Sequence, residues 1–383
     1  MANTKSPEIL IVGCGVIGLS IARKLHKSGV EKITLVEKGL CGEESSWAAA
    51  GMLGPQAEAD EGGAFFDMCS ASRDLYPELA AELFDETGID IELDRSGTLY
   101  LAFTDDDVSE LHERFRWQRK AGLAVEHLSA EAARRAEPSI SPDVRGALFF
   151  TNDWQVENRK LLAALKRYAE INGIEIIENA KVERLIVEDG HVIGAETSES
   201  RIIAGKTVLA TGAWTSLIKL ELAEMPFEIV PVRGQIIAFR LADRLFEHVI
   251  YSRRGYLVPR KDGRILAGST SEHTGFDKAL TESAANRLRE MAGEIAPILA
   301  GLEITDQWSG LRPFAEDGLP IIGSINGIDD LFIATAHYRN GILLAPLTAK
   351  LAAENLVSGM DSEYFTMFGP GRFKRHGVVS GSV

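Results

Sequence analysis

Cysteine is scarce in this chain, and long apolar runs are missing. The 383 residues include only three cysteines, Cys14, Cys41 and Cys69, which are too few and too scattered for a disulfide framework or a four-ligand zinc site. We therefore expect three structural thiols and no metal site. No apolar run approaches the roughly 18 to 20 residues that a membrane-spanning helix needs. The sequence thus predicts no membrane association and a cytoplasmic location, because its first residues lead directly into a strand pattern.

Basic residues are outnumbered by acidic ones. Lys and Arg total 41 against 56 Asp and Glu, which gives a formal net charge of −15. A nucleic-acid surface needs a cluster of positive charge, and no such cluster is present, so we exclude that partner. The hydrophobic fraction of 45% and the charged fraction of 25% are ordinary for a globular protein of one or two domains.

The most informative stretch lies at residues 8–22, where an apolar run is followed by three glycines and an apolar helical pattern. Gly13 permits a tight turn, Gly15 lets the backbone approach a pyrophosphate, and Gly18 allows the helix to pack closely on the strand. The helix N-terminus would then direct free N–H groups at the ligand. This pattern predicts a dinucleotide-binding turn.

A second strand pattern, at residues 32–36, ends at Glu37, about twenty residues beyond the glycines. A carboxylate at this position can accept hydrogen bonds from both ribose hydroxyls of an adenosine. It would repel a 2′-phosphate, which argues against an NADP-type ligand. The choice between NAD and FAD stays open at this point.

Small residues dominate the stretch that follows, residues 45–53. Hydroxyls at Ser45 and Ser46 can reach phosphate or ribitol oxygens, while Ala50, Gly51 and Met52 are slim enough to pass close to a planar ring. An NAD-binding half would instead resume its alternation of strand and helix here. We therefore favour contact with a flavin. The same serines could also cap a helix N-terminus, and the two interpretations are compatible.

The rest of the chain predicts an α/β (α+β) fold with two domains. The nucleotide fold resumes late, at a strand and turn in residues 206–214, so its domain is assembled from separated segments. Alternating apolar patterns at 227–239, 255–260 and 264–270 predict antiparallel strands. We assign residues 1–88, 150–222 and 306–383 to a Rossmann-like FAD-binding domain, and residues 89–149 and 223–305 to a mainly antiparallel substrate domain.

Two late motifs carry a family resemblance. One is Gly-Leu-Arg-Pro at residues 310–313, and the other is His-Tyr-Arg-Asn-Gly-Ile-Leu-Leu-Ala-Pro at residues 337–346. Together with the glycine turn and residues 255–270, they resemble the glycine oxidases linked to thiamine biosynthesis, within the D-amino-acid oxidase family. The resemblance implies non-covalent FAD and a homo-oligomer, since several members are tetramers. A cysteinyl flavin of the sarcosine oxidase kind is excluded, because all three cysteines precede residue 70.

The resemblance also implies which residues bind the cofactor and the substrate. Arg312 resembles the arginine that pairs with a substrate carboxylate, and Tyr256 and Arg339 resemble other members of that pocket. Both arginines could instead form structural ion pairs, and Tyr256 could be a core residue. His337 could act as a general base, but its place before a helix favours a hydrogen bond on the cofactor side. The implied cofactor contacts are Val16, Ile17, Glu37, Lys38, Ser45, Ser46, Ala50, Gly51, Met52, Val182, His337, Tyr338, Arg339, Asn340, Gly341, Ile342 and Leu343, beside Gly13, Gly15 and Gly18.

The predicted activity is oxidative deamination of glycine, sarcosine or a small D-amino acid such as D-alanine. A planar guanidinium fixes a carboxylate in distance and orientation, so hydride can leave the α-carbon toward flavin without an acid or base residue. Reduced flavin would pass its electrons to O2, giving H2O2. The substrate stays open, because Ser271 stands where glycine oxidases commonly place a larger apolar side chain.

Three alternatives remain. The first is a flavin dehydrogenase that passes electrons to a quinone or a protein acceptor. The second is a flavoprotein that binds its ligand without turnover. The least favoured is an NAD-dependent dehydrogenase, because of the small-residue stretch at residues 45–53.

Overall fold

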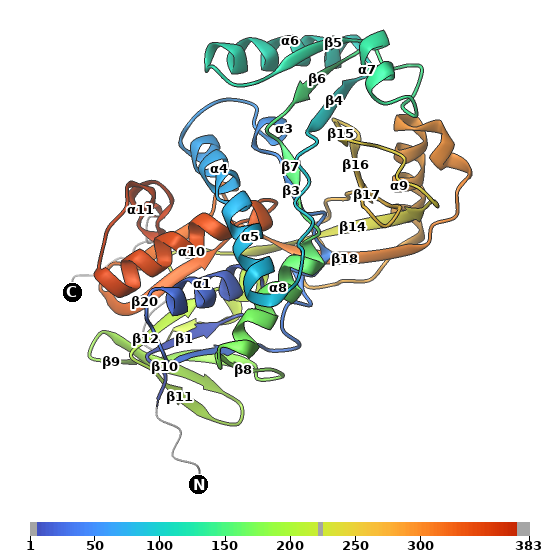
Figure 1. Ribbon diagram of the computed structural model, residues 1–383. Helices are drawn as coiled ribbons and strands as arrows, with labels where there is room; N and C mark the ends of the chain where they lie inside the picture. Colours follow the sequence, from blue (N-terminus) through green and yellow to red (C-terminus); the bar gives the residue numbers. More distant parts are fainter. Residues whose placement is uncertain (1–5, 221–224, 374–383) are drawn as a thin grey trace, which may run out of the picture.

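Two large sheets organise the protein, whose computed structural model describes residues 6–220 and 225–373. Figure 1 shows one sheet with its helices in the lower part of the molecule and the other in the upper right. The mixed α/β fold with a second, mainly antiparallel sheet is confirmed. The division into two domains along the predicted boundaries remains a proposal. Strand β18 (Asp306–Phe314), which those boundaries place in the cofactor domain, pairs within the second sheet.

The first sheet has the strand order β13-β9-β10-β20-β12-β1-β2-β8, with β11 on β10 and β19 on β20. Its centre is parallel, and all four residues of β1 are buried, as expected for a strand covered on both faces. The strands are β1 (Ile9–Val12), β2 (Ile33–Val36), β8 (Glu175–Ile177), β9 (Val182–Glu188), β10 (His191–Thr197), β11 (Arg201–Ile203), β12 (Lys206–Leu209), β13 (Lys219–Leu220), β19 (Ile321–Ile325) and β20 (Ile328–Thr335).

Alternation along β1 divides the core into two layers. Ile9 and Ile11 belong to the cluster that contains the helices, whereas Leu10 and Val12 belong to the cluster on the opposite face. The helical layer is built by α1 (Val16–Lys27), α4 (Ala64–Asp74), α5 (Tyr76–Thr87), α8 (Asn158–Ile171) and α10 (Gly341–Ser358), which Figure 1 shows packed side by side.

The sequence predicts one helix over residues 65–87, and the structure has two. Helix α4 ends at Asp74 and α5 begins at Tyr76, so the chain bends at Leu75. Pro77 lies in the first turn of α5, where a missing N–H costs nothing, but it cannot continue a preceding helix. Pro77 therefore accounts for the bend, which the apolar periodicity of the sequence does not indicate.

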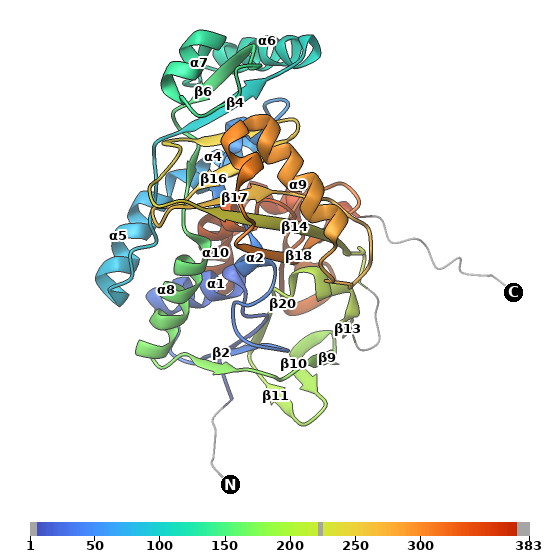
Figure 2. The ribbon, with the colours of Figure 1, turned by 90° about the vertical axis from the view of Figure 1, so that its right-hand side faces the viewer.

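The second sheet has the order β18-β14-β17-β16-β15-β4-β6-β5 and is antiparallel except between β4 and β15. Figure 2 shows α9 (Glu282–Ile295) lying along it. The predicted hairpin at residues 255–270 is confirmed as β16 and β17, joined through Gly263 at φ 82°. The remaining strands and helices are β4 (Thr98–Ala102), β5 (Glu126–Ser129), β6 (Gly146–Phe150), β14 (Val230–Arg240), β15 (Val249–Ser252), β16 (Gly255–Pro259), β17 (Arg264–Gly268), α6 (Asp105–Lys120), α7 (Ala130–Ala136) and the 3-10 helix η2 (Pro297–Gly301).

Short elements connect the two sheets. Strands β3 (Met52–Leu53) and β7 (Trp154–Gln155) pair as a two-stranded ribbon between them. The remaining short elements are α2 (Ser45–Ala48), α3 (Pro55–Glu58) and η1 (Gly212–Leu217), together with α11 (Glu363–Phe368) and η3 (Pro370–Arg372), which pack on β19 of the first sheet. No helix in residues 6–220 and 225–373 is both long and apolar enough to cross a membrane.

The prediction of three free thiols is wrong for two of them. Cys14 and Cys41 form a disulfide, with their Cα atoms 4.9 Å apart, and Cys69 is a buried free thiol. The two partners are 27 residues apart in sequence, but each follows one of the adjacent parallel strands β1 and β2. Loops that follow neighbouring parallel strands meet at one sheet edge, and cysteine counting cannot detect this proximity.

Candidate active site

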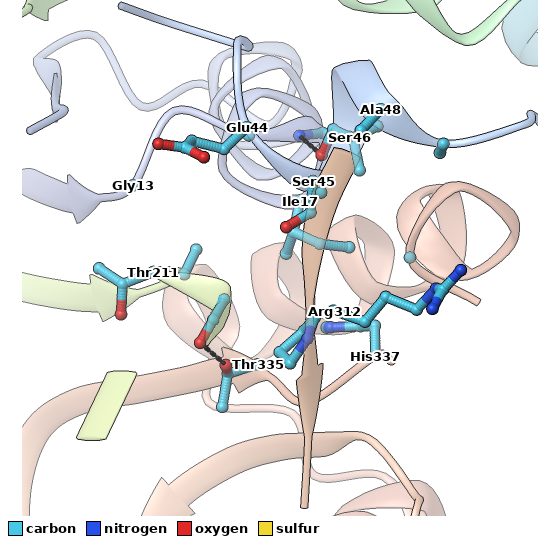
Figure 3. A pocket seen from close by; sticks show the side chains of 18 of the residues that line it. Gly13, Ile17, Glu44, Ser45, Ser46, Ala48, Thr211, Arg312, Thr335 and His337 are labelled. Carbon is cyan, nitrogen blue, oxygen red and sulfur yellow. Dashed lines mark hydrogen bonds between the residues drawn. The ribbon is translucent and has the colours of Figure 1, made fainter. Parts of the chain in front are cut away.

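One large cavity is lined by residues from both sheets (Figure 3). It encloses about 1670 Å³ of space outside the protein atoms, counted to its open mouth. Its lining runs from the glycine turn to Tyr256 and Arg312 on the second sheet, so the cavity suits an elongated ligand such as a dinucleotide together with a small substrate. Figure 3 shows Ser45, Ser46 and Ile17 on one side of the cavity and Thr335 and His337 on the other.

The glycine turn has room for no side chain. Gly13 has φ 107°, and a Cβ atom there would lie 2.4 Å from the carbonyl oxygen of Ala210. A Cβ atom on Gly18 would lie 2.0 Å from the carbonyl oxygen of Gly13. Gly18 does not line the cavity; it lets α1 approach the turn from behind, as the motif predicts. The turn thus fits a pyrophosphate passing close to the backbone.

Glu37 is held at the end of β2 by backbone donors. Its carboxylate accepts hydrogen bonds from the N–H of Cys14 at 2.9 Å and of Gly39 at 3.3 Å, and it borders the cavity. Lys38 pairs with Glu44, and its ammonium lies 4.0 Å from the ring centroid of Trp214. These contacts place an acidic hydrogen-bond acceptor where the ribose of an adenosine is expected.

The two serines of the small-residue stretch anchor it to its neighbours. Ser46 Oγ accepts a hydrogen bond from the first N–H of α1, on Val16, at 3.1 Å, and Ser45 Oγ donates to the carbonyl of Leu311. Neither serine caps its own helix, because the N-cap of α2 is Glu44. The hydroxyls therefore fix this stretch between the glycine turn and the second sheet.

The cavity brings together most of the predicted cofactor residues. Leu343 does not line it; this side chain is 2% exposed and lies in the core with the rest of α10. The predicted residues that line the cavity are Gly13, Gly15, Val16, Ile17, Glu37, Lys38, Ser45, Ser46, Ala50, Gly51, Met52, Val182, His337, Tyr338, Arg339, Asn340, Gly341 and Ile342.

Arg312 reaches the cavity from β18. Its guanidinium donates to Ser269 Oγ at 2.7 Å and to the carbonyl of Thr270 at 3.1 Å. It lies against Gly234, where a Cβ atom would be 2.2 Å from Nη2. Both acceptors are neutral, and no carboxylate pairs with Arg312 within the described residues. Burial and the nearby cation of Arg339 lower the pKa of Arg312. An anionic ligand beside this guanidinium would oppose both effects and stabilise its charged form.

Arg339 already has a carboxylate partner. Its guanidinium forms a two-point ion pair with Glu58, at 2.9 and 2.8 Å, and also donates to the Tyr251 hydroxyl at 3.2 Å. Tyr251 in turn donates to Glu58 at 3.0 Å. Burial alone would raise the pKa of Glu58, but Arg339 outweighs it and the pKa is lowered. Arg339 therefore borders the cavity as part of a neutralised pair.

Tyr256 and His337 are both buried against the cavity. Tyr256 is 5% exposed, and its ring stacks on Tyr251 with centroids 6.3 Å apart. His337 Nε2 is 3.0 Å from Thr348 Oγ1, inside α10, and burial lowers the pKa of His337 to about 3. A neutral imidazole that is hydrogen-bonded to helix α10 has a structural role. This agrees with the expectation that His337 is not a general base.

Sequence reasoning missed Glu58 and Ser269. Glu58 lies 281 residues from its partner Arg339 in the chain, and Ser269 contacts Arg312 across 43 residues, so no local spacing connects them. Ser271, singled out in the sequence, is exposed and does not line the cavity. The signal that could have located Ser269 is its position at the end of the predicted strand at 264–270, directly after β17 of the structure.

The cavity fits FAD by shape and chemistry. The glycine turn, the Glu37 carboxylate and the small-residue stretch supply positions for pyrophosphate, ribose and a flat ring along one continuous wall. No cysteine is among the residues that line the cavity, so this lining offers no thiol for a cysteinyl flavin.

Comparison with known proteins agrees with the geometry. The family model for FAD dependent oxidoreductases (DAO) matches residues 8–355. The chain is 37% identical to a glycine oxidase of Pseudomonas aeruginosa, over 93% of this chain and 96% of that protein. It superposes on the crystal structure of a glycine oxidase from Geobacillus kaustophilus with a TM-score of 0.89 and 33% identity, covering 97% and 99% of the two chains. A bifunctional ThiO/ThiG protein of Trichormus variabilis is 34% identical over 96% of this chain and 55% of its own length.

Proposed function

The chain belongs to the DAO family of FAD-dependent oxidoreductases, on its glycine oxidase branch, and we propose that it oxidises glycine or another small amine that carries a carboxylate. Sarcosine and D-alanine are the further candidates. The products are the imine, which hydrolyses to the oxo acid, and H2O2. A homo-oligomeric state is part of this proposal.

The observation that carries the proposal is the unpaired guanidinium of Arg312. A half-buried cation that faces a cavity, and whose acceptors among the described residues are all neutral, is stabilised by an anion that enters the cavity. Two parallel N–H groups match the geometry of a carboxylate. Ser269 and Gly234 hold the guanidinium in place, Ser269 by accepting from it and Gly234 by leaving room for it.

Positioning is the main task of the side chains. Arg312 fixes the substrate carboxylate, and Tyr256 lies on the same wall of the cavity. A carboxylate held at two points orients the bond between the α-carbon and its hydrogen toward the flavin position, and such fixed geometry accounts for a large part of a rate enhancement. When bound, FAD supplies the acceptor for the two electrons of that bond and returns them to O2.

No side chain is assigned as an acid or base. His337 stays neutral at physiological pH and its Nε2 is engaged by Thr348. Glu58 stays ionised and paired with Arg339. The proton balance therefore requires the substrate amine to enter in its neutral form, so turnover rises with pH through the amine's own titration.

A substrate panel tests the proposal. Purified protein is mixed with glycine, sarcosine and D-alanine in air, and H2O2 is measured with a peroxidase-coupled dye. A parallel assay with an artificial electron acceptor under argon measures acceptor preference. We expect turnover with at least one of the three amines and O2. Absence of turnover with every amine and either acceptor contradicts the proposal.

A further inference from the structure

The small-residue stretch is held from behind by an unusual set of donors. The backbone carbonyls of Ser46 and Trp47 accept from Asn158 Nδ2 at 2.9 and 3.0 Å. The carbonyl of Ala48 accepts from the indole of Trp308 at 3.0 Å. Ser46 and Ala48 line the cavity, and their carbonyls are bonded to side chains that do not line it.

Arg260 continues this row of donors. Its Nη2 donates to the carbonyl of Ala50 at 2.8 Å and to Asn158 Oδ1 at 3.1 Å, while Nη1 donates to Gln155 and Val156 at 3.0 and 2.8 Å. Arg260 is 3% exposed. It lies just beyond β16 in the second sheet and bonds to residues of the β3–β7 ribbon and the loop before it, so it links the second sheet to the back of the small-residue stretch.

The opposite side of the stretch is left open. Within the described residues, the N–H groups of Ala50 and Gly51 have no protein acceptor, and both residues line the cavity. Gly51 has φ 72°, and a Cβ atom there would lie 2.1 Å from the carbonyl of Val156 and 3.2 Å from Arg260 Nη2. The carbonyls of residues 46–48 and 50 are therefore bonded to side chains outside the cavity, while the free N–H groups of the stretch belong to residues that line the cavity. The peptide dipoles of the stretch thus present their positive ends to the cavity.

Positive charge reinforces that polarity. Burial lowers the pKa of Arg260 to about 10, so the guanidinium remains charged at neutral pH. Glu157 lies 4.0 Å from Arg260 Nε, but that nitrogen has no hydrogen-bond partner among the described residues. Arg159 adds a second cation, 3.5 Å from the ring centroid of Trp47. Fixed dipoles backed by cations favour negative charge in front of them.

We propose that Arg260 is a positioning residue for the flavin: it holds the Ala50 carbonyl so that the Gly51 N–H, on the opposite side of the same peptide plane, faces the ring and favours its electron-rich, reduced form. Trp308 fixes the neighbouring peptide in the same way, because the Ala48 carbonyl lies opposite the Ala49 N–H, and Ala49 also lines the cavity. The proposal concerns the cofactor and does not depend on which amine is the substrate.

The test compares Arg260→Met and Arg260→Lys with the wild-type holoprotein. The readouts are the Kd of FAD from flavin fluorescence, the visible absorption spectrum, and the flavin reduction potential from equilibration with a reference dye. We expect Arg260→Met to raise the Kd about tenfold or more, the cost of a lost charged hydrogen bond, and to lower the potential. Lysine keeps the charge and restores part of the potential.

Arg264→Met is the matched control. Arg264 lies on the same hairpin and pairs with Asp262 and Glu157, without contact to residues 45–52. We expect the Kd of FAD for Arg264→Met to stay within about twofold of wild type, and its flavin reduction potential to be unchanged. If Arg260→Met does not fold, Trp308→Phe decides, because it removes the indole donor and keeps an aromatic ring beside Trp47. A folded Arg260→Met, or in its place Trp308→Phe, with unchanged Kd, spectrum and potential overturns the proposal.

Discussion

At the scale of single residues, two arginines border one cavity and differ in their partners. Arg339 is neutralised by Glu58, whereas among the described residues Arg312 bonds only to the Ser269 hydroxyl and the Thr270 carbonyl. A guanidinium that already has a carboxylate gains little from a second one. This difference supports the proposal that Arg312 binds the anion of a ligand.

Replacing Arg312 with alanine should weaken binding of a carboxylate substrate strongly. A charged hydrogen-bonded pair in a buried site is worth about 2–4 kcal/mol, which corresponds to a rise in KM of roughly 30- to 1,000-fold. The KM of Arg312→Lys should lie between those of the wild type and Arg312→Ala, because lysine keeps the charge but loses two-point binding. Steady-state kinetics with glycine or sarcosine measures this.

Arg254→Ala is the control for that substitution. Arg254 pairs with Glu294 and stacks on Phe103, outside the cavity. Its KM should match wild type. A normal KM in Arg312→Ala would instead remove Arg312 from the substrate pocket.

Prediction from sequence succeeded where chemistry is local in the chain. Gly13, Gly15 and Gly18 lie within six residues and need one turn geometry, so their spacing alone defines the turn. The Glu58–Arg339 pair joins residues 281 apart, and Arg260 meets the Ala50 carbonyl across 210 residues. Such contacts arise only when folding brings distant segments of the chain together, and no periodicity encodes them.

At the scale of elements, the short helix α3 depends on one buried carboxyl. Asp153 accepts from the N–H groups of Gln56 and Ala57 at 3.1 and 2.7 Å, and α3 carries Glu58. Burial raises the pKa of Asp153 to about 7 from an ordinary value of 3.8, and the nearby Glu58 adds to the rise. The stability of α3 therefore depends on pH.

This linkage predicts a pH dependence of stability. The folded protein holds the Asp153 proton more tightly than the unfolded chain, so the contribution is complete below about pH 4 and is lost as pH rises through 7. Between pH 5 and 8 the wild type should lose about 2–3 kcal/mol more than Asp153→Asn, which cannot titrate. Urea unfolding at both pH values measures the difference. Parallel pH profiles would contradict it.

The disulfide joins two loops of the nucleotide fold, after β1 and after β2. Closing a loop of 27 residues removes entropy from the unfolded chain worth about 3.5 kcal/mol. Cys14→Ser and Cys41→Ser should therefore each lower the free energy of unfolding by up to about this amount. Reductant should lower the free energy of unfolding of the wild type but not that of either variant. Mass analysis after alkylation should find one free thiol without reductant and three with it. Three free thiols in the native protein would contradict the bond.

At the scale of the whole molecule, the cavity draws its walls from both sheets, so a bound cofactor connects them. A ligand that binds only the folded state stabilises it by about 2.7 kcal/mol at a hundred times its Kd. The melting temperature should rise with free FAD concentration, and the gain should follow the measured Kd. A melting temperature independent of FAD would show that the cavity is not its binding site.

The central claim is that the Arg312 guanidinium fixes a substrate carboxylate for electron transfer to flavin. Its most direct measurement is the rate of flavin bleaching after anaerobic mixing of holoprotein with glycine, compared with methylamine and glycinamide, which lack the carboxylate. We predict rapid bleaching by glycine, a loss of at least about a hundredfold for the two analogues, and little discrimination among the three in Arg312→Ala. Equal bleaching of the wild type by all three amines would contradict the account.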